Sequence, residues 1–197
     1  MTTDTAISHQ LTTRDGVVLD VRLAGEADEA ALRVFFDAVS EQDRRFRFFA
    51  AGQHVSPDQL DPLIHADHFR SESYIAFDHA TGELVASGLL ACDGKLDTGE
   101  IAVSVRADYR GRGVGHAFFD HREAQARRCG ADAACFAAVI RPADHPARPG
   151  DYRPLDSFWR ARGYAPIPDF VTHLAWKEHG QAEESPKPLQ YWLRTFG

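Results

Sequence analysis

Three glycines alternate with two other residues in the segment RGRGVG, and this spacing suits the binding of a phosphate group. Gly111, Gly113 and Gly115 carry no Cβ, so a ligand can lie directly against the main chain and the loop can form a tight turn. A predicted helix begins at about Gly113, and the free N–H groups and dipole of a helix N-terminus attract anions. Arg110 and Arg112 add positive charge beside the loop. We therefore expect phosphate or pyrophosphate to bind here.

Two other phosphate-binding loops fit the same segment less well. The Walker pattern requires a lysine followed by serine or threonine after its second glycine, and this loop contains no such lysine. The dinucleotide fingerprint requires a third glycine where His116 stands, and an acidic residue after the next strand, where Arg141 stands. The Walker pattern is excluded, and a dinucleotide-binding domain remains a weaker alternative.

The elements that must position this loop follow from hydrophobic periodicity and from turn and capping residues. Apolar runs predict strands at residues 17–23, 74–78, 83–91, 100–105, 134–140, 170–177 and 189–196. Amphipathic patterns and caps predict helices at about residues 27–49, 57–65, 113–128 and 155–163. The glycine loop thus connects the fourth strand to the third helix of a mixed α/β arrangement, which we expect to form one domain over residues 1–197.

In this context RGRGVG matches the Arg/Gln-x-x-Gly-x-Gly/Ala signature, and the chain resembles the GCN5-related N-acetyltransferase (GNAT) superfamily. The segment SFWRARGYAP resembles that family's FYxxxGF segment, and the hairpin at 74–91 takes the place of its strands two and three. The stretch EIAVSVRADYRGRGVG is similar to AEFAVVV…GRGLG of bacterial protein-lysine acetyltransferases, and RRFRFF resembles their SRYLRFF helix end. The resemblance implies the GNAT fold, an α+β arrangement in which helices flank a mixed, mostly antiparallel sheet of about seven strands.

The resemblance also implies acetyl-CoA, or another acyl-CoA, as co-substrate. Its pyrophosphate would bind the loop residues Arg110, Gly111, Arg112, Gly113, Val114, Gly115 and His116. The strand residues Val103, Ser104 and Val105 would offer hydrogen bonds to the pantetheine arm. The main-chain N–H of Val103 would stabilise the negative charge that develops on the acyl oxygen.

Glu100 is the candidate general base. An alkylamine has a pKa near ~10.4 and is almost entirely protonated at neutral pH, so a carboxylate or a water chain must take its proton. Glu100 begins a predicted strand and shares one face with Ala102 and Ser104. The matching glutamate is taken as the base in the similar lysine acetyltransferases. Our hypothesis is direct transfer in a ternary complex to a primary amine, either a small molecule or a protein lysine. A solvent-facing charge at a strand end is the alternative.

The general acid is less well defined. The position that matches the family's tyrosine holds Trp159, whose indole is no useful acid at neutral pH. Either the CoA thiolate leaves unaided, or Tyr152 or Tyr164 substitutes, or catalysis has been lost. The last case is the competing hypothesis, a non-catalytic module that binds acyl-CoA and has a regulatory role.

Composition limits the class of protein. Hydrophobic residues make up 44% and charged residues 26% of the 197 residues, as in globular proteins. No apolar run could span a bilayer and no basic and apolar leader follows Met1, so we expect a cytoplasmic protein that does not bind membranes. The net charge of −7 argues against binding of nucleic acid. The last predicted strand, with Tyr191 and Trp192 expected to be exposed, would support a homodimer.

The cysteines, the histidines and the proline-rich loop give weaker indications of a functional site. The three cysteines lack metal or redox spacing and are expected to be small buried residues. His65 and His68 lack a third ligand nearby, so we expect no metal site. The proline-rich loop at 142–154 either covers the acceptor site or is a surface insertion.

Overall fold

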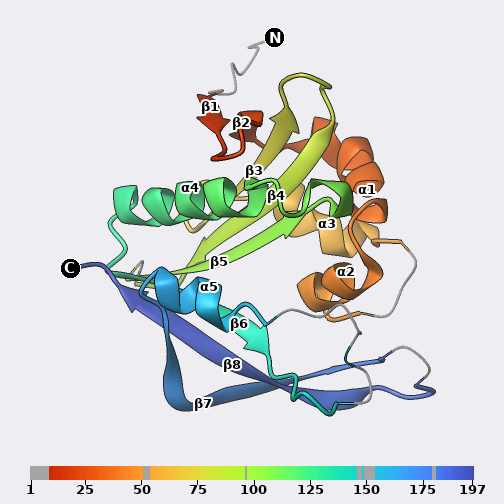
Figure 1. The fold of residues 1–197 in the computed structure, drawn as a ribbon, viewed down its shortest axis with the longest axis vertical. Coiled ribbons are helices and arrows are strands. Elements are labelled where there is room, and N and C mark those ends of the chain that lie inside the picture. The colour runs from red at the N-terminus through yellow and green to blue at the C-terminus, as the bar shows by residue number, and fades with distance from the viewer. Residues whose placement is uncertain (1–8, 51–53, 96, 146–147, 149–153, 179–180) are drawn as a thin grey trace.

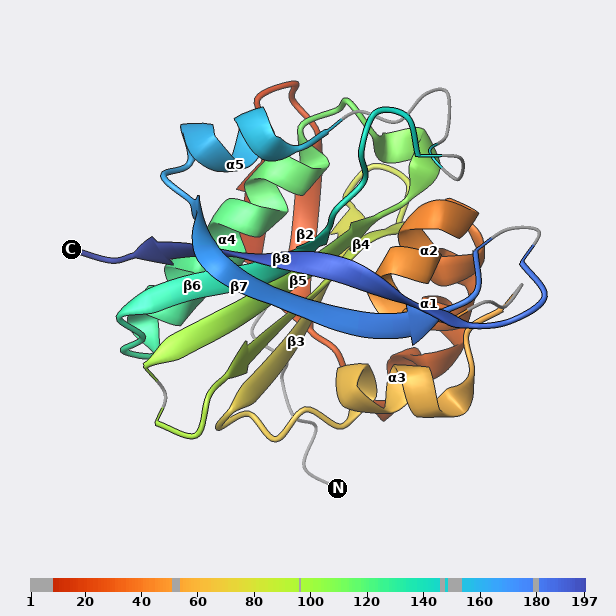
Figure 2. The ribbon, with the colours of Figure 1, turned by 90° about the horizontal axis from the view of Figure 1, so that it is seen from below.

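The computed structural model describes residues 9–50, 54–95, 97–145, 148, 154–178 and 181–197. They form a mixed sheet with helices on both faces (Figures 1 and 2). In spatial order its strands are β1 (His9–Thr12), β2 (Val18–Leu23), β3 (Ser71–Asp78), β4 (Leu84–Cys92), β5 (Thr98–Val105), β6 (Ala133–Val139), β8 (Ser185–Thr195) and β7 (Ala165–Trp176). The expected GNAT arrangement is confirmed, with β5 and β6 parallel and the other neighbouring strands antiparallel.

Strand β1 was not predicted from the sequence. It has four residues, HQLT, which are too few for an alternating pattern to stand out. It pairs with β2 after a turn in which the Thr13 N–H donates to the Val17 carbonyl at 2.8 Å. The sheet described here therefore has eight strands where about seven were expected.

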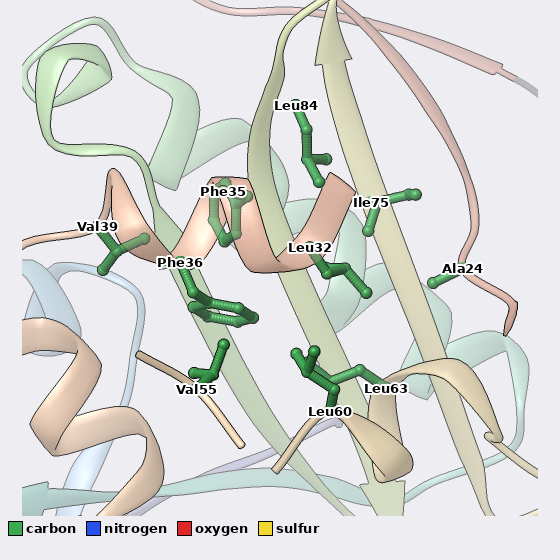
Figure 3. Packing of buried hydrophobic residues seen from close by; sticks show 10 residues of the cluster. All are labelled: Ala24, Leu32, Phe35, Phe36, Val39, Val55, Leu60, Leu63, Ile75 and Leu84. Atoms are coloured by element: carbon green, nitrogen blue, oxygen red, sulfur yellow. The ribbon is translucent and has the colours of Figure 1, made fainter. Parts of the chain in front are cut away.

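The helices lie on opposite faces of the sheet (Figure 2). One face carries α1 (Glu29–Asp37), α2 (Glu41–Phe48) and α3 (Pro57–Ile64), and the other carries α4 (Val114–Arg128) and α5 (Asp156–Ala161). Figure 3 shows the core of the first face, where Leu32 and Phe36 of α1 lie near Leu60 and Leu63 of α3 and Ile75 of β3. This core holds α1 and α3 against the sheet.

The first predicted helix is in fact two helices. The apolar pattern of α1 ends near Ala38, and α2 begins after Ser40, whose hydroxyl accepts a hydrogen bond from the Asp43 N–H at 3.2 Å. A serine that caps a helix in this way stabilises a new N-terminus. The break sets α2 apart from α1 and places its last turn near β5, where the candidate base lies.

Helix α4 packs closely on the sheet, and its bounds agree with the prediction. A Cβ at Gly88 of β4 would lie 2.8 Å from the Phe118 ring, so this glycine permits the close approach of the helix. The helix ends where the Ala131 N–H donates to the Ala126 carbonyl at 3.0 Å and Gly130 adopts a φ of +87°. A glycine with positive φ just after the last turn is a common way for a helix to end.

Strands β5 and β6 pair over a short distance and then separate (Figure 1). Their three residue pairs end with Glu100 and Cys135, whereas β6 continues to pair with β8 as far as Val139. We call the region beyond this last pair, between residues 101–105 of β5 and 136–139 of β6, the strand split. It leaves one edge of β5 without a neighbouring strand.

Two expectations about exposure were wrong. Trp192 is 5% exposed, because its side chain packs with Phe136 and Tyr164 in the core, and β8 is not an edge strand, because β7 pairs with it. The aromatic residues expected to support a dimer are therefore not on an exposed edge strand. Cys129 is exposed at the end of α4, whereas Cys92 and Cys135 are partly buried.

Candidate active site

The glycine loop lies between β5 and α4, as predicted. Gly111 and Gly113 adopt φ values of +74° and +78°, a conformation that side chains with a Cβ rarely adopt. Gly113 is the N-cap of α4, and a Cβ there would lie 3.1 Å from the Cβ of Thr13 and 3.2 Å from Oδ2 of Asp15. The loop conformation thus depends on glycine, and the turn between β1 and β2 supports it.

The main-chain N–H groups of the loop are free to bind a ligand. In the part of the chain that the structure describes, no group accepts a hydrogen bond from the N–H of residues 111–116. The first N–H of this region with an acceptor belongs to Ala117, which donates to the Gly113 carbonyl at 3.0 Å. Several unpaired N–H groups at a helix N-terminus form an anion-binding site.

The two arginines of the loop differ in their contacts. Arg110 forms an ion pair with Asp43 and donates to the Ser40 hydroxyl at 2.7 Å, so its charge is held at the start of α2. Arg112 is exposed and lies over the Tyr109 ring at 4.3 Å. Of the two arginines expected to add charge beside the loop, Arg110 is therefore already paired, with a partner that is distant in the sequence.

His116 presents its ring to α5. The ring packs edge-on against Phe158 with 4.6 Å between the centroids. Burial, and then the charge of Arg162, lower the pKa of His116 below its ordinary value. The side chain is therefore mainly neutral at pH 7, and its main-chain N–H is the group that the loop offers to an anion.

Glu100 lies at the start of the strand split, on the sheet face that carries α2. The next residue, Ile101, packs with Phe119 and Ala126 of α4. Successive side chains of a strand point to opposite faces, so Glu100 points away from α4. The carboxylate is accessible, yet the surrounding protein removes enough water to raise its pKa, while the charge of Arg47 on α2 opposes that rise. A carboxylate with a raised pKa at this place is suited to accept a proton.

The three strand residues named for cofactor binding are not equivalent. The carbonyl of Asp97, just before β5, accepts from the Ala133 N–H of β6 at 3.1 Å, so the main chain of Asp97 points toward β6. Main-chain groups point alternately to the two sides of a strand, so every second residue after Asp97 also points toward β6. The N–H and C=O groups of Val103 and Val105 therefore point toward the strand split. Ser104 points its main chain toward β4, where it pairs with Ser87, and its side chain is buried.

The candidates for the general acid are held in packed surroundings. Trp159 of α5 stacks in an aromatic cluster, 4.1 Å from the Phe136 ring centroid. The Tyr164 hydroxyl donates to Glu123 at 3.1 Å, and burial, followed by the Glu123 charge, raises its pKa well above the ordinary range. Tyr164 is thus committed to a structural hydrogen bond. Tyr152 lies outside the described residues.

Two further expectations concern a metal site at His65 and the loop at 142–154. No group of three or more potential metal ligands occurs within the described ranges. His65 instead contacts Asp61 and Glu26 at the surface, at 2.8 and 3.1 Å. The loop at 142–154 lies partly outside the described residues, at 146–147 and 149–153, so its covering role stays a prediction.

The sequence did not connect Cys135, Tyr191 or Arg47 with Glu100. Cys135 faces it across the ladder, and the Glu100 charge contributes to the raised pKa values of Cys135 and Tyr191. Arg47 interacts with it electrostatically from α2. Arg47 lies within RRFRFF, so its resemblance to a known helix end was a signal, but its position opposite Glu100 depends on the tertiary fold.

Comparisons with known proteins agree with this geometry. Residues 36–149 match the family model described as the acetyltransferase (GNAT) family. A relative named Acetyltransferase PA5475, from Pseudomonas aeruginosa, is 32% identical over 118 residues, which cover 59% of this chain and 63% of the relative. The match therefore spans less than two thirds of that relative.

Solved structures share the fold. The GNAT domain of S. lividans PAT has a TM-score of 0.72 at 20% identity, covering 96% of this chain and 97% of that chain. The structure of yncA from Salmonella typhimurium with its cofactor acetyl-CoA has a TM-score of 0.58 at 15% identity, covering 91% of this chain and 94% of that chain. No helix within the described part of the chain is long and apolar enough to cross a membrane.

Proposed function

The chain belongs to the acetyltransferase (GNAT) family, and from that premise we propose that it transfers an acetyl group from acetyl-CoA to a primary amine by direct transfer in a ternary complex. The observation that carries this proposal is the row of free main-chain N–H groups at residues 111–116, at the N-terminus of α4. The amine belongs to a small molecule or to a protein lysine.

The loop fits the pyrophosphate of CoA. Gly111 and Gly113 hold the main chain in a conformation that leaves its N–H groups unpaired, and Arg112 keeps an exposed guanidinium beside them. Such a site binds a diphosphate through N–H donors, the helix dipole and one mobile cation. The acetyl-CoA bound to the structurally similar yncA supports the same ligand class for this chain.

The strand split fits an extended chain. The Val103 carbonyl and the N–H and C=O groups of Val105 face it without a partner strand, so they can accept from and donate to the amides of the pantetheine arm. The N–H of Val103 is the donor that we assign to the acyl oxygen, where negative charge develops during transfer. Acetyl-CoA supplies the activated acetyl group as a thioester.

Glu100 is assigned the role of general base. An ammonium group must lose its proton before its nitrogen can attack a carbonyl carbon, and the Glu100 carboxylate takes that proton directly or through one water molecule. Its raised pKa makes it a stronger base than an ordinary glutamate, and the charge of Arg47 limits that rise. No described tyrosine is assigned as the acid.

The acyl-CoA-binding module remains the second candidate because Trp159 replaces the family tyrosine and Tyr164 is bonded to Glu123. One experiment separates the two. Release of free thiol from acetyl-CoA is followed with a thiol reagent across a panel of amines and lysine peptides, beside calorimetry with CoA. A transferase releases thiol in an amine-dependent way, whereas the module binds CoA and releases none. Absence of CoA binding would contradict both.

A further inference from the structure

Helix α2 brings three arginines to the face of the sheet that carries Glu100, and two of them have protein partners. Arg44 donates to the Phe36 carbonyl at 2.9 Å. Arg45 forms ion pairs with Glu41 and with Glu178, which also accepts from Arg141 at 2.7 Å. These two arginines are therefore explained by the fold.

Arg47 is different. It is partly buried, and in the described part of the chain it forms no hydrogen bond and lies within ion-pair distance of no carboxylate. Its contacts are the Phe48 ring, 5.2 Å from its guanidinium carbon, and the longer-range attraction of Glu100. Burial lowers the pKa of Arg47 to about 10, so it keeps its charge at neutral pH although it has lost much of its water.

An arginine in this state favours an anionic ligand. A guanidinium has five N–H donors and no acceptor, and leaving it desolvated and unpaired is costly. The side chain is only partly buried, and none of its nitrogen atoms is both fully buried and without a partner, so a ligand can still reach them from solvent. A planar carboxylate can accept two of its hydrogen bonds at once. Among the described residues no carboxylate pairs with Arg47, and Glu100 acts on it only at longer range.

The two opposite charges, on α2 and on the strand β5 that it contacts, distinguish classes of acceptor. A simple alkylammonium or a lysine side chain that approaches Glu100 also meets the positive charge of Arg47, which repels it. An amino acid carries an ammonium for Glu100 and a carboxylate for Arg47, so both of its charges are matched. Zwitterionic acceptors therefore fit this pair better than purely cationic ones.

We propose that the acceptor is a free amino acid, whose carboxylate binds Arg47 while its amino group faces Glu100. This inference rests on the proposed acetyl transfer and names its substrate class. Arg47 is here a specificity-determining residue that contacts the acceptor, and it is not required to take part in proton transfer.

The test compares matched acceptors. Thiol release from acetyl-CoA is measured with a panel of amino acids, with the amide of each, with the decarboxylated amine of each, and with lysine peptides. The amide has the less basic amino group, which is more often neutral, so basicity alone would favour the amide. We expect amino acids to be preferred by at least about tenfold in kcat/KM. Equal or better use of the amides, amines or lysine peptides would overturn the proposal.

Variants of Arg47 supply the second readout. Arg47→Gln should raise KM for the preferred amino acid by about tenfold or more and leave its amide within about twofold, whereas Arg47→Lys should retain part of the preference. Arg128→Gln, at an exposed position on α4 across the sheet, is the matched control. If Arg47→Gln lowers kcat for acid and amide alike and leaves their ratio unchanged, Arg47 acts through Glu100 or the fold, and the proposal is wrong.

Failure of the proposed function gives a different result. If no acceptor releases thiol, acetyl transfer is rejected, and binding of the same amino acids and amides to CoA-saturated protein is measured by calorimetry. Tighter binding of the amino acids that Arg47→Gln abolishes would still support the Arg47 site. Equal binding of acid and amide, or no binding of either, would reject it.

Discussion

Glu100 of β5 and Cys135 of β6 form the last residue pair of the ladder between these parallel strands. The candidate base therefore lies where the strands separate and where an extended ligand could first enter between them. Burial, and then the Glu100 charge, raise the pKa of Cys135 to about 12, so its thiol stays protonated. A protonated thiol is a poor nucleophile and does not compete for an acyl group.

Replacing Glu100 by Gln should lower kcat by about 10²- to 10³-fold, because general base catalysis contributes effects of this size. CoA affinity, measured by calorimetry, should stay within about twofold. The wild-type rate should fall as the pH decreases through a pKa that lies above the ordinary glutamate value, since the carboxylate must be ionised to accept a proton. An unchanged pH–rate profile in the variant would remove Glu100 from the mechanism.

Gly113→Ala should weaken CoA binding because its Cβ would approach Thr13 and Asp15 and force the loop to move. Gly82→Ala is the matched control, since Gly82 also has a positive φ, of +70°, but has nothing within 4 Å of the added Cβ. Gly82→Ala should lose about 1 kcal/mol of unfolding free energy in urea from its positive φ alone, and Gly113→Ala should lose more because of its close contacts. Equal CoA affinity in the two variants would show that the loop shape does not matter for binding.

Arg112→Gln should weaken CoA binding by about three- to tenfold at low salt, and the loss should shrink as salt is added, because this guanidinium is exposed. Arg110→Gln should affect CoA less and lower thermal stability more, since it breaks the contacts with Asp43 and Ser40. Calorimetry over a salt series and melting curves measure the two effects. The reverse order would place Arg110 at the ligand.

Tyr164→Phe should lower the free energy of unfolding by about 1–3 kcal/mol, because it removes the donor to Oε2 of the buried Glu123 and leaves that carboxylate only its contacts with Arg194 and Arg127 through Oε1. The value of kcat should stay within about twofold. If kcat instead fell strongly and the basic side of the pH–rate profile changed, Tyr164 would be the missing acid.

His121 should make the protein sensitive to acid. It lies against His9 and beside the buried Arg122, and burial, followed by the Arg122 charge, lowers its pKa to about 3. The unfolded chain therefore takes up this proton at higher pH than the folded one. The contribution of His121 to the free energy of unfolding is complete above about pH 6.5. It is lost as the pH falls toward 3, by at most about 1.4 kcal/mol per pH unit. His121→Asn should reduce this slope in urea unfolding, and parallel curves would contradict the assignment.

Most elements could be predicted because they depend on neighbours in the sequence. Ser56 and Gln59 cap the start of α3, and Gly130 ends α4, as their residue types indicate. Strand β1 and the break at Ser40 were missed, since four residues show no periodicity and a continuous helical pattern hides a cap.

The candidate site likewise has a part that the sequence predicted and a part that it did not. The glycine loop was predictable because its function depends on residues that are adjacent in the chain. The partners of its charged residues were not, since Asp43 lies 67 positions before Arg110 and Glu123 lies 41 positions before Tyr164. A sequence pattern does not specify which distant side chain compensates a charge or a hydroxyl.

The amino-acid sequence by itself thus determined the loop that can hold a diphosphate and the family to which the chain belongs, because glycine conformation and helix capping are local properties. The tertiary structure decided where β5 and β6 separate, which face Glu100 occupies and which arginine stands opposite it. These features arise when α2, β5 and β6 pack together, and packing brings together residues that no spacing in the chain relates.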